Sequence, residues 1–315
     1  MANQSEVVVF ELIGFPGLPQ KYHIFVSVIM FIVYFVALLA NCTVIALTMC
    51  NVKLHHSMYI IIANLALSDL LFDSITLPKM IAKYWFGDGS ITFAGCMFQL
   101  FCVHYLGSVD SFIIMLMAAD RYVAICMPLR YSSVVTNKLT MYMCSLLWML
   151  ASIYASINAI WYSSFPYCHS RKINNCFCVN MAVMVLACGD ISLLKQTSFY
   201  VAMAILLFPL AFIIFSYIII IIVTIYSSVR SENLQKTFYT CTTHLFIIAM
   251  YFGPRMFIYT AYYINLVFSL DMSVLILLLY TYIPHMASPI IYCLRTREIM
   301  QIVEKIFTTL PKILM

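Results

Sequence analysis

Two carboxylates in the middle of apolar stretches are the first residues of this chain that could do chemistry. Asp69 lies in the segment NLALSDLL, and Asp110 lies in the segment GSVDS. An ionised side chain at membrane depth is costly, which makes each acid a candidate functional residue. Two facing carboxylates repel each other unless a cation or a shared proton lies between them. The sequence is therefore compatible with two independently hydrogen-bonded acids or with a pocket for a small cation.

An arginine follows a proline inside another apolar stretch. Arg255 comes directly after Pro254, about a third of the way into that stretch from its predicted outer end. Its side chain could snorkel outward, bond to backbone carbonyls freed by the proline, or line a water-accessible cavity and pair with an anionic ligand. His104 lies at a similar depth, where a packed, hydrogen-bonded histidine is as plausible as a ligand contact.

The tripeptide Asp120-Arg121-Tyr122 ends a third apolar stretch. A lone arginine at a helix end would simply snorkel to the lipid headgroups. The adjacent acid changes this interpretation, because Asp120 can hold the guanidinium in one geometry. Breakage of that ion pair could then be coupled to a change of conformation.

Seven apolar stretches must position these side chains. The chain has 315 residues, of which 64% are hydrophobic and 9% charged, and its mean hydropathy is +0.99, all of which argues against a water-soluble fold. We predict an all-α fold: a bundle of seven transmembrane helices that makes up essentially the whole protein. Hydrophobic windows place the helices at residues 22–50, 57–83, 93–127, 138–162, 195–229, 235–263 and 270–294.

The basic residues predict the orientation of the bundle. With the N-terminus outside, the inner segments carry more Lys and Arg than the outer ones, as the positive-inside rule requires. The predicted domains are an extracellular N-terminus at 1–21, a seven-helix domain at 22–294 and a cytoplasmic tail at 295–315. Apolar residues at helical spacing in the tail predict a short amphipathic eighth helix on the inner membrane face, an ordinary charged tail being the alternative. Asn3 begins an N-glycosylation sequon, which is usable only on the lumenal side.

Cysteines gather on the predicted outer side, in the long loop from about 163 to 194 and at the start of the third span. On an oxidising face they favour disulfides over metal ligation, because no His/Cys spacing fits a zinc site. The sequence by itself leaves the pairing open. The cysteines concerned are Cys96, Cys168, Cys176, Cys178 and Cys188.

Other function classes lack their signatures. No basic run suggests nucleic acid. A transporter or channel would be expected to show internal repeats or interrupted hydrophobic segments, and neither is found. A membrane enzyme needs a catalytic constellation, but His55, His56 and His244 stand without suitable partners in the sequence. We therefore expect a protein with no catalytic residues.

Sequence motifs along the whole chain are more informative than composition. The most specific is MAADRYVAICMPLRY at 117–131; the others are Asn41, LHHSMY at 54–59, Trp148, SY at 216–217 and KTFYTCTTHL at 236–245. In this order they resemble the odorant receptors, a family of rhodopsin-like G-protein-coupled receptors. The resemblance implies a multi-pass receptor of the plasma membrane that binds a small odorant and activates a stimulatory G protein of the olfactory type, which raises cyclic AMP.

The resemblance also implies particular contacts. It implies the disulfides Cys96–Cys178 and Cys168–Cys188, with Cys176 left as a free thiol or an alternative partner. It favours sodium as the ion at the two acids, with no other metal and no cofactor. The odorant is expected to contact Val103, His104, Gly107, Ser108, Ile205, Arg255 and Tyr259.

The ligand class depends on Arg255. If Arg255 faces the cavity, the odorant carries an acid group. The alternative is a non-odorant rhodopsin-like receptor for a small acidic or lipid ligand, whereas an amine receptor would be expected to carry an acid where Val103 stands.

Coupling and switching are implied for a further set of residues at the inner face and in the last two spans. They are Asp120, Arg121, Tyr122, Tyr217, Phe252, Pro254, Pro289 and Tyr292.

Four departures from the family pattern bear on these roles. Ser288 stands where the family usually has asparagine before proline, which puts the sodium linkage in question. Tyr251 and Phe252 stand in the reverse of the usual order, so the switch role near Pro254 is assigned to Phe252. Asp110 replaces a glutamate and Ser57 replaces a proline.

Overall fold

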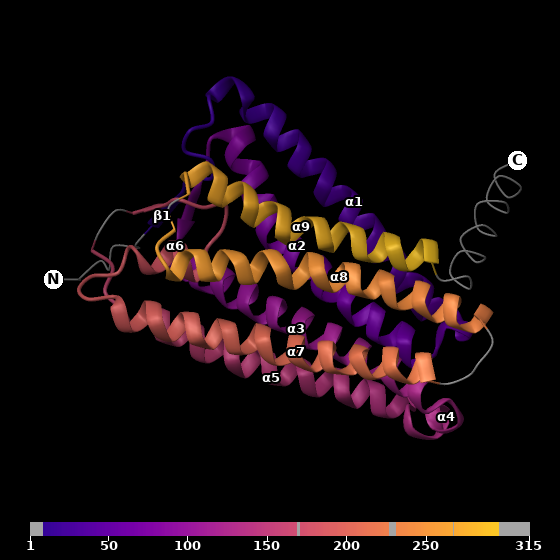
Figure 1. The fold of residues 1–315 in the computed structure, drawn as a ribbon. Coiled ribbons are helices and arrows are strands. Elements are labelled where there is room, and N and C mark those ends of the chain that lie inside the picture. Colours follow the sequence, from indigo (N-terminus) through magenta and orange to yellow (C-terminus); the bar gives the residue numbers. More distant parts are fainter. Residues whose placement is uncertain (1–8, 169–170, 227–230, 267, 296–315) are drawn as a thin grey trace, which may run out of the picture.

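The computed structural model describes residues 9–168, 171–226, 231–266 and 268–295 (Figure 1). Seven of its helices are long and apolar enough to cross a membrane, which confirms the predicted seven-helix bundle and makes the chain a multi-pass membrane protein. Their bounds are α1 His23–Cys50, α2 Ser57–Phe86, α3 Phe93–Cys126, α5 Asn137–Ser163, α7 Ser192–Tyr226, α8 Ser231–Tyr263 and α9 Leu270–Arg295.

The helix ends lie close to the predicted ranges, with the largest difference at the sixth span, which was predicted to start at 235 and starts at Ser231. Three of the described helices are capped at their start by a side-chain hydroxyl: Thr92 Oγ1 accepts a hydrogen bond from the Gly95 amide, Thr136 Oγ1 from the Leu139 amide, and Ser269 Oγ from the Met272 amide. The predicted eighth helix and Asn3 lie outside the described residues.

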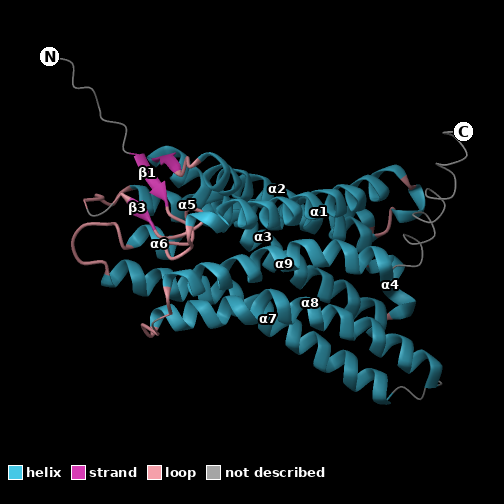
Figure 2. Ribbon diagram, turned by 90° about the horizontal axis from the view of Figure 1, so that it is seen from above, coloured by secondary structure: helices cyan, strands magenta, loops and turns pink. Residues whose placement is uncertain are grey.

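Short elements close the two ends of the bundle. The short helix η1 Gln20–Tyr22 precedes α1, and between the long helices lie η2 Val52–Leu54, η3 Pro128–Arg130, α4 Tyr131–Val134 and α6 Asn180–Met184. Three strands, β1 Val9–Leu12, β2 Ser90–Thr92 and β3 Lys172–Ile173, form a small sheet that the all-α prediction did not include. Strand β1 lies in the middle, antiparallel to β2 and parallel to β3. The strands and α6 lie together at one end of the bundle (Figure 2). We call it the disulfide end, because the disulfides Cys96–Cys178 and Cys168–Cys188 lie there.

Helices α2 and α3 are the most buried of the seven spans, and α1 is the least. In lipid the hydrophobic effect does not drive helices together, so packing and interhelical hydrogen bonds hold the bundle. The four buried carboxylates of the two central helices consequently face protein rather than lipid: Asp69, Asp73, Asp110 and Asp120.

Asn41 fastens α1 to α9 at a backbone carbonyl that a proline leaves free. Pro289 has no amide hydrogen, so the carbonyl of His285, four residues earlier, has no helical partner. The side-chain nitrogen of Asn41 donates to that carbonyl at 3.2 Å and to the carbonyl of Ala37 at 2.9 Å. Asn41 is fully buried, so the bond replaces one that water cannot supply.

Replacing Asn41 with alanine is therefore expected to destabilise the bundle by about 0.6–2 kcal/mol, the range for interhelical hydrogen bonds in membranes. The thermal unfolding midpoint of the purified protein measures this. The exposed Thr43, which bonds only to its own helix, provides the control Thr43→Ala. An unchanged midpoint for Asn41→Ala would mean that the α1–α9 bond contributes nothing to stability.

Candidate functional site

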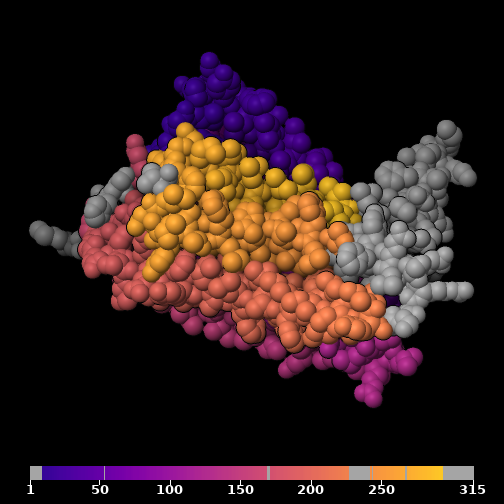
Figure 3. All heavy atoms as spheres, viewed as in Figure 1, coloured from indigo at the N-terminus to yellow at the C-terminus, as the bar shows by residue number. Residues whose placement is uncertain are grey.

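A cavity of about 310 Å³ lies near the disulfide end, between α3, α7, α8, α9 and the loop that precedes α7. Its volume falls in the range of small-molecule sites. All of the residues that the sequence analysis expected to contact a ligand lie on its wall: Val103, His104, Gly107, Ser108, Ile205, Arg255 and Tyr259. In Figure 3 the side chains of α7, α8 and α9 lie beside one another on the face of the bundle that is turned to the viewer.

Arg255 is buried, with 7% of its surface exposed, and lines the cavity. Its guanidinium carbon lies 3.6 Å from the ring centroid of Tyr251 and 6.0 Å from that of Tyr280. Among the described residues no carboxylate lies within 4.0 Å of it. Of the alternatives considered for Arg255, the structure shows the cavity-lining one, with a charge that two aromatic faces offset only in part.

His104 lies across the cavity on α3. Its ring meets the ring of Tyr154 edge-on at 6.2 Å, and its Nε2 has no hydrogen-bond partner among the described residues. The same wall contains residues that the sequence analysis did not select: Ser111, Tyr154, Phe177, Asn180 and Tyr280. The unpartnered ring nitrogen of His104 and the buried guanidinium of Arg255 give the cavity wall polar groups that can orient a small ligand.

Tyr251 joins α3 to α8 through two residues of the cavity wall, Gly107 and Ser111. Its hydroxyl donates to the Gly107 carbonyl at 2.6 Å and lies 3.3 Å from Ser111 Oγ. Phe252 is 1% exposed, and its ring packs edge-on against Tyr251 at 5.1 Å. From the sequence, Phe252 is the residue predicted to have the switch role near Pro254. The structure adds Tyr251 as the polar contact between the two helices.

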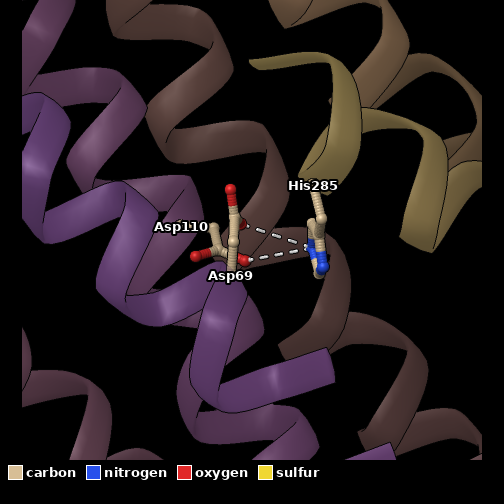
Figure 4. A group of neighbouring side chains, drawn as sticks. All are labelled: Asp69, Asp110 and His285. Carbon is tan, nitrogen blue, oxygen red and sulfur yellow. Dashed lines mark ion pairs between the residues drawn. The ribbon is translucent and has the colours of Figure 1, made fainter. Parts of the chain in front are cut away.

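Below the cavity, an acid–histidine cluster joins α2, α3 and α9. It consists of Asp69, Asp73, Asp110 and His285, none more than 3% exposed. His285 Nδ1 lies 2.8 Å from Asp73 Oδ1, and His285 Nε2 lies 3.5 Å from Asp69 Oδ1 and 3.8 Å from Asp110 Oδ2. Figure 4 shows the carboxylates of Asp69 and Asp110 directed at the imidazole. Asp69 and Asp110 therefore lie close together, as predicted from the sequence, and His285 lies next to both.

Sequence reasoning missed Asp73 and His285. Asp73 follows Asp69 by four residues and so lies on the same face of α2, a spacing that could have been noticed. His285 lies far away in sequence, and only the packing of α9 against α2 and α3 brings it to the acids.

Two disulfides hold the loop over the cavity. Cys96–Cys178 ties the start of α3 to the loop, and Cys168–Cys188 closes the loop on itself. The amide of Cys178 also donates to Gln99 Oε1 at 2.9 Å. Cys176 is a free thiol, and burial raises its pKa well above the ordinary value, so it is unreactive at neutral pH.

The chain matches a family model described as "Olfactory receptor" over residues 30–310. It belongs to the olfactory receptor family. It is 33% identical over 305 residues to olfactory receptor 1 of Rattus norvegicus, covering 97% of this chain and 96% of that protein. It is 34% identical over 305 residues to olfactory receptor 52K1 of Homo sapiens, with the same coverage of both chains. The resemblance read from the motifs is thereby confirmed, and this G-protein-coupled receptor is not an enzyme.

At the end of the bundle opposite the disulfides, Asp120 is held in this olfactory receptor mainly by neutral donors. Ser57 Oγ donates to Asp120 Oδ1 at 3.0 Å and the Tyr131 hydroxyl donates to the same oxygen at 2.9 Å, whereas Arg121 Nε lies 3.9 Å from Oδ2. Burial, reinforced by the charge of Asp120, raises the pKa of Tyr131 to about 12, so Tyr131 keeps its donated proton. Ser57 can make this contact because it is not the proline that the family usually has there.

The remaining predicted switch residues lie in or beside one core. Tyr217 and Tyr292 are buried there, and Tyr122 packs against it. The Tyr292 hydroxyl donates to Met117 Sδ at 3.6 Å, and its ring lies 5.9 Å from the ring of His244. Pro254 and Pro289 lie inside α8 and α9. Their role in switching stays a prediction.

Proposed function

We propose that this olfactory receptor binds an anionic odorant in the cavity and transmits the binding to a stimulatory G protein of the olfactory type, which raises cyclic AMP. In this proposal the disulfide end and the N-terminus are extracellular, the tail is cytoplasmic and the receptor lies in the plasma membrane. Disulfides persist in oxidising compartments, which supports that orientation.

The observation that carries the proposal is the buried guanidinium of Arg255 on the cavity wall. A buried charge without an ion-pair partner is costly, and a carboxylate would supply two parallel charge-assisted hydrogen bonds. The apolar part of an odorant would then pack on Val103, Ile205 and Tyr259, with His104 able to bond a polar atom.

Binding can favour signalling only if the odorant binds two arrangements of the bundle with unequal affinity. We infer that the described arrangement is the resting one, because Asp120 Oδ1 accepts hydrogen bonds from both Ser57 and Tyr131 in it. The Tyr251–Gly107 hydrogen bond joins α3 and α8 at a residue of the cavity wall. An odorant that competes for Tyr251 or moves Arg255 would let the cytoplasmic end of α8 swing outward. By linkage, the G protein raises odorant affinity in return.

Whether Asp69 and Asp110 can hold sodium depends on the atoms around the ion's position. Sodium is a hard cation that prefers oxygen ligands, and the His285 nitrogen lies 3.5 and 3.8 Å from the two carboxylate oxygens that would hold it. These residues therefore do not fit sodium, and no step of the mechanism is assigned to that ion. A cation that accepts nitrogen as well as oxygen ligands remains part of the proposal.

The test measures cyclic AMP in cells that express the surface-verified receptor with an olfactory G protein. The ligands are matched carboxylates, amines and neutral odorants of equal chain length. We expect the carboxylates to raise cyclic AMP and the amines to be silent. A response to neutral odorants alone would leave the receptor and reject the anionic ligand. A response to none of the three classes, in cells where a control olfactory receptor signals, would count against the proposed coupling.

Releasing Asp120 is expected to raise the basal signal. In the double variant Ser57→Ala/Tyr131→Phe, the buried carboxylate loses both neutral donors, each worth about 1.5–3 kcal/mol for a bond to a charged group. Together the two bonds are worth about 3–6 kcal/mol, so their loss shifts the equilibrium away from the resting arrangement by at least about 100-fold. Agonist-free cyclic AMP per receptor at the surface should rise by about tenfold or more. Tyr142→Phe, at an exposed position of α5, is the control. Unchanged basal cyclic AMP at equal surface density would show that these bonds do not restrain the switch.

A further inference from the structure

We propose that the acid–histidine cluster binds one divalent transition-metal ion of the zinc class, with Asp69, Asp110 and His285 as its ligands and Asp73 as the outer partner of the imidazole. Each of the three ligands contributes one atom, and these atoms lie within 4.8 Å of one another. They come from three different helices, so an ion there would join α2, α3 and α9.

The distances suit a small tetrahedral ion. Zinc lies about 2.0–2.2 Å from nitrogen and oxygen ligands, which places neighbouring ligand atoms roughly 3.3–3.6 Å apart. His285 Nε2 lies 3.5 Å from Asp69 Oδ1 and 3.8 Å from Asp110 Oδ2. These two separations lie within a few tenths of an ångström of zinc geometry, and the third, between the two carboxylates, is at most 4.8 Å. The fourth position would be left for water.

Asp73 sets the histidine in the form that a metal needs. Its carboxylate lies 2.8 Å from His285 Nδ1 and favours the proton on that nitrogen; in this tautomer Nε2 presents a lone pair to the other two acids. A carboxylate on the far nitrogen of a metal-ligating histidine is the usual outer-sphere arrangement, because it fixes both the ring orientation and the tautomer. The rings of Phe72 and Tyr282 pack edge-on against the imidazole at 5.1 and 6.3 Å and further restrict it.

The cluster is more than a group of acids. His285 Nε2 and both carboxylate oxygens of Asp110 are buried and have no hydrogen-bond partner among the described residues. No Lys or Arg of the described part of the chain lies within 4.0 Å of the three acids. Two acceptors and a lone pair that converge in a buried space repel one another unless a positive species lies between them.

The nitrogen of His285 determines which class of metal ion fits the cluster. Imidazole suits zinc, copper, nickel and iron, whereas magnesium and calcium favour sites built from oxygen alone. A divalent ion also offsets the charge of two carboxylates, which a monovalent ion cannot do.

The test uses the full-length receptor in lipid nanodiscs, purified through a peptide epitope because a polyhistidine tag would bind the probe. Zinc chloride is titrated after chelation, in parallel with sodium and magnesium chloride. The readouts are bound zinc per receptor after gel filtration and the thermal midpoint from the fluorescence of the three tryptophans. Neither readout involves an odorant or a G protein, so failure here is distinguishable from failure of the proposed function.

Three variants test whether His285 and Asp73 have the roles in zinc binding that we propose. His285→Asn keeps a donor for Asp73 but removes the Nε2 ligand, and should abolish the bound zinc and the rise in midpoint. Asp73→Asn should weaken zinc binding by about 10–100-fold, the usual effect of losing an outer-sphere partner. His56→Ala removes an exposed imidazole outside the cluster and should bind zinc as the unmodified receptor does.

One zinc per receptor, lost in His285→Asn and retained in His56→Ala, supports the proposal. An equal rise in midpoint with sodium that survives in His285→Asn would overturn it in favour of an oxygen-only site. Zinc without effect, together with a midpoint that follows pH only when His285 is present, would overturn it in favour of a bridging proton.

Discussion

Replacing Arg255 with alanine is expected to abolish the response to carboxylate odorants while the receptor still reaches the cell surface. The guanidinium is buried on the cavity wall and has no carboxylate partner among the described residues, so the ligand would supply its counter-charge. Truncating one partner of a buried ion pair costs about 3–5 kcal/mol. We expect the half-maximal concentration to rise at least on the order of 100-fold, measured as cyclic AMP at matched surface density.

Two further substitutions make the result specific. Arg255→Lys keeps the charge but loses the planar fork, so an intermediate response is expected. Lys79→Ala removes a charge at the same end of the bundle, where Lys79 pairs with Asp88 at 2.9 Å on the surface, and should leave the response unchanged. If Arg255→Ala responds to carboxylates like the unmodified receptor, Arg255 does not bind the odorant and its burial has a structural role only.

The double variant Cys96→Ala/Cys178→Ala is expected to lose most of its surface expression. The bond spans 82 residues and holds the loop that carries Phe177 against the bundle. Loss of such a disulfide costs about 2–5 kcal/mol, a large part of the stability of a typical domain. The ratio of surface to total receptor by flow cytometry, with the thermal midpoint of the solubilised protein, measures the effect.

Cys176→Ala is the matched control, because Cys176 lies on the same loop, is buried and forms no disulfide. It should reach the surface normally. A double variant that is displayed as well as Cys176→Ala would contradict the structural role assigned to the Cys96–Cys178 bond.

Much of the cavity wall could be predicted because its residues follow helical spacing. Val103, His104, Gly107 and Ser108 fall on one face of α3, and Arg255 and Tyr259 are four residues apart on α8. Their convergence on a single cavity was expected only through the resemblance to odorant receptors. Spacing within one helix says nothing about which face of another helix it meets.

At the end of the bundle opposite the disulfides, the partners of Asp120 could not be predicted from the sequence either. The sequence indicated an ion pair between Asp120 and Arg121, because the two are adjacent. The structure gives Asp120 shorter contacts with Ser57 and Tyr131, which belong to α2 and α4. The substitution of serine for proline at 57 was visible in the sequence, but its hydrogen-bond partner was not.

The sequence by itself determined the seven spans of this receptor, because 20 or more apolar residues in succession have one stable arrangement in lipid, the helix. It also determined which side chains would be costly to bury, since that cost depends on residue type and depth alone. The tertiary structure decided what those side chains meet. His285 joins Asp69, Asp73 and Asp110 because α9 packs against α2 and α3, and Arg255 stacks on Tyr251 and Tyr280 because α8 and α9 place those rings around it. Contacts between distant segments depend on how whole helices pack, and no local pattern encodes that.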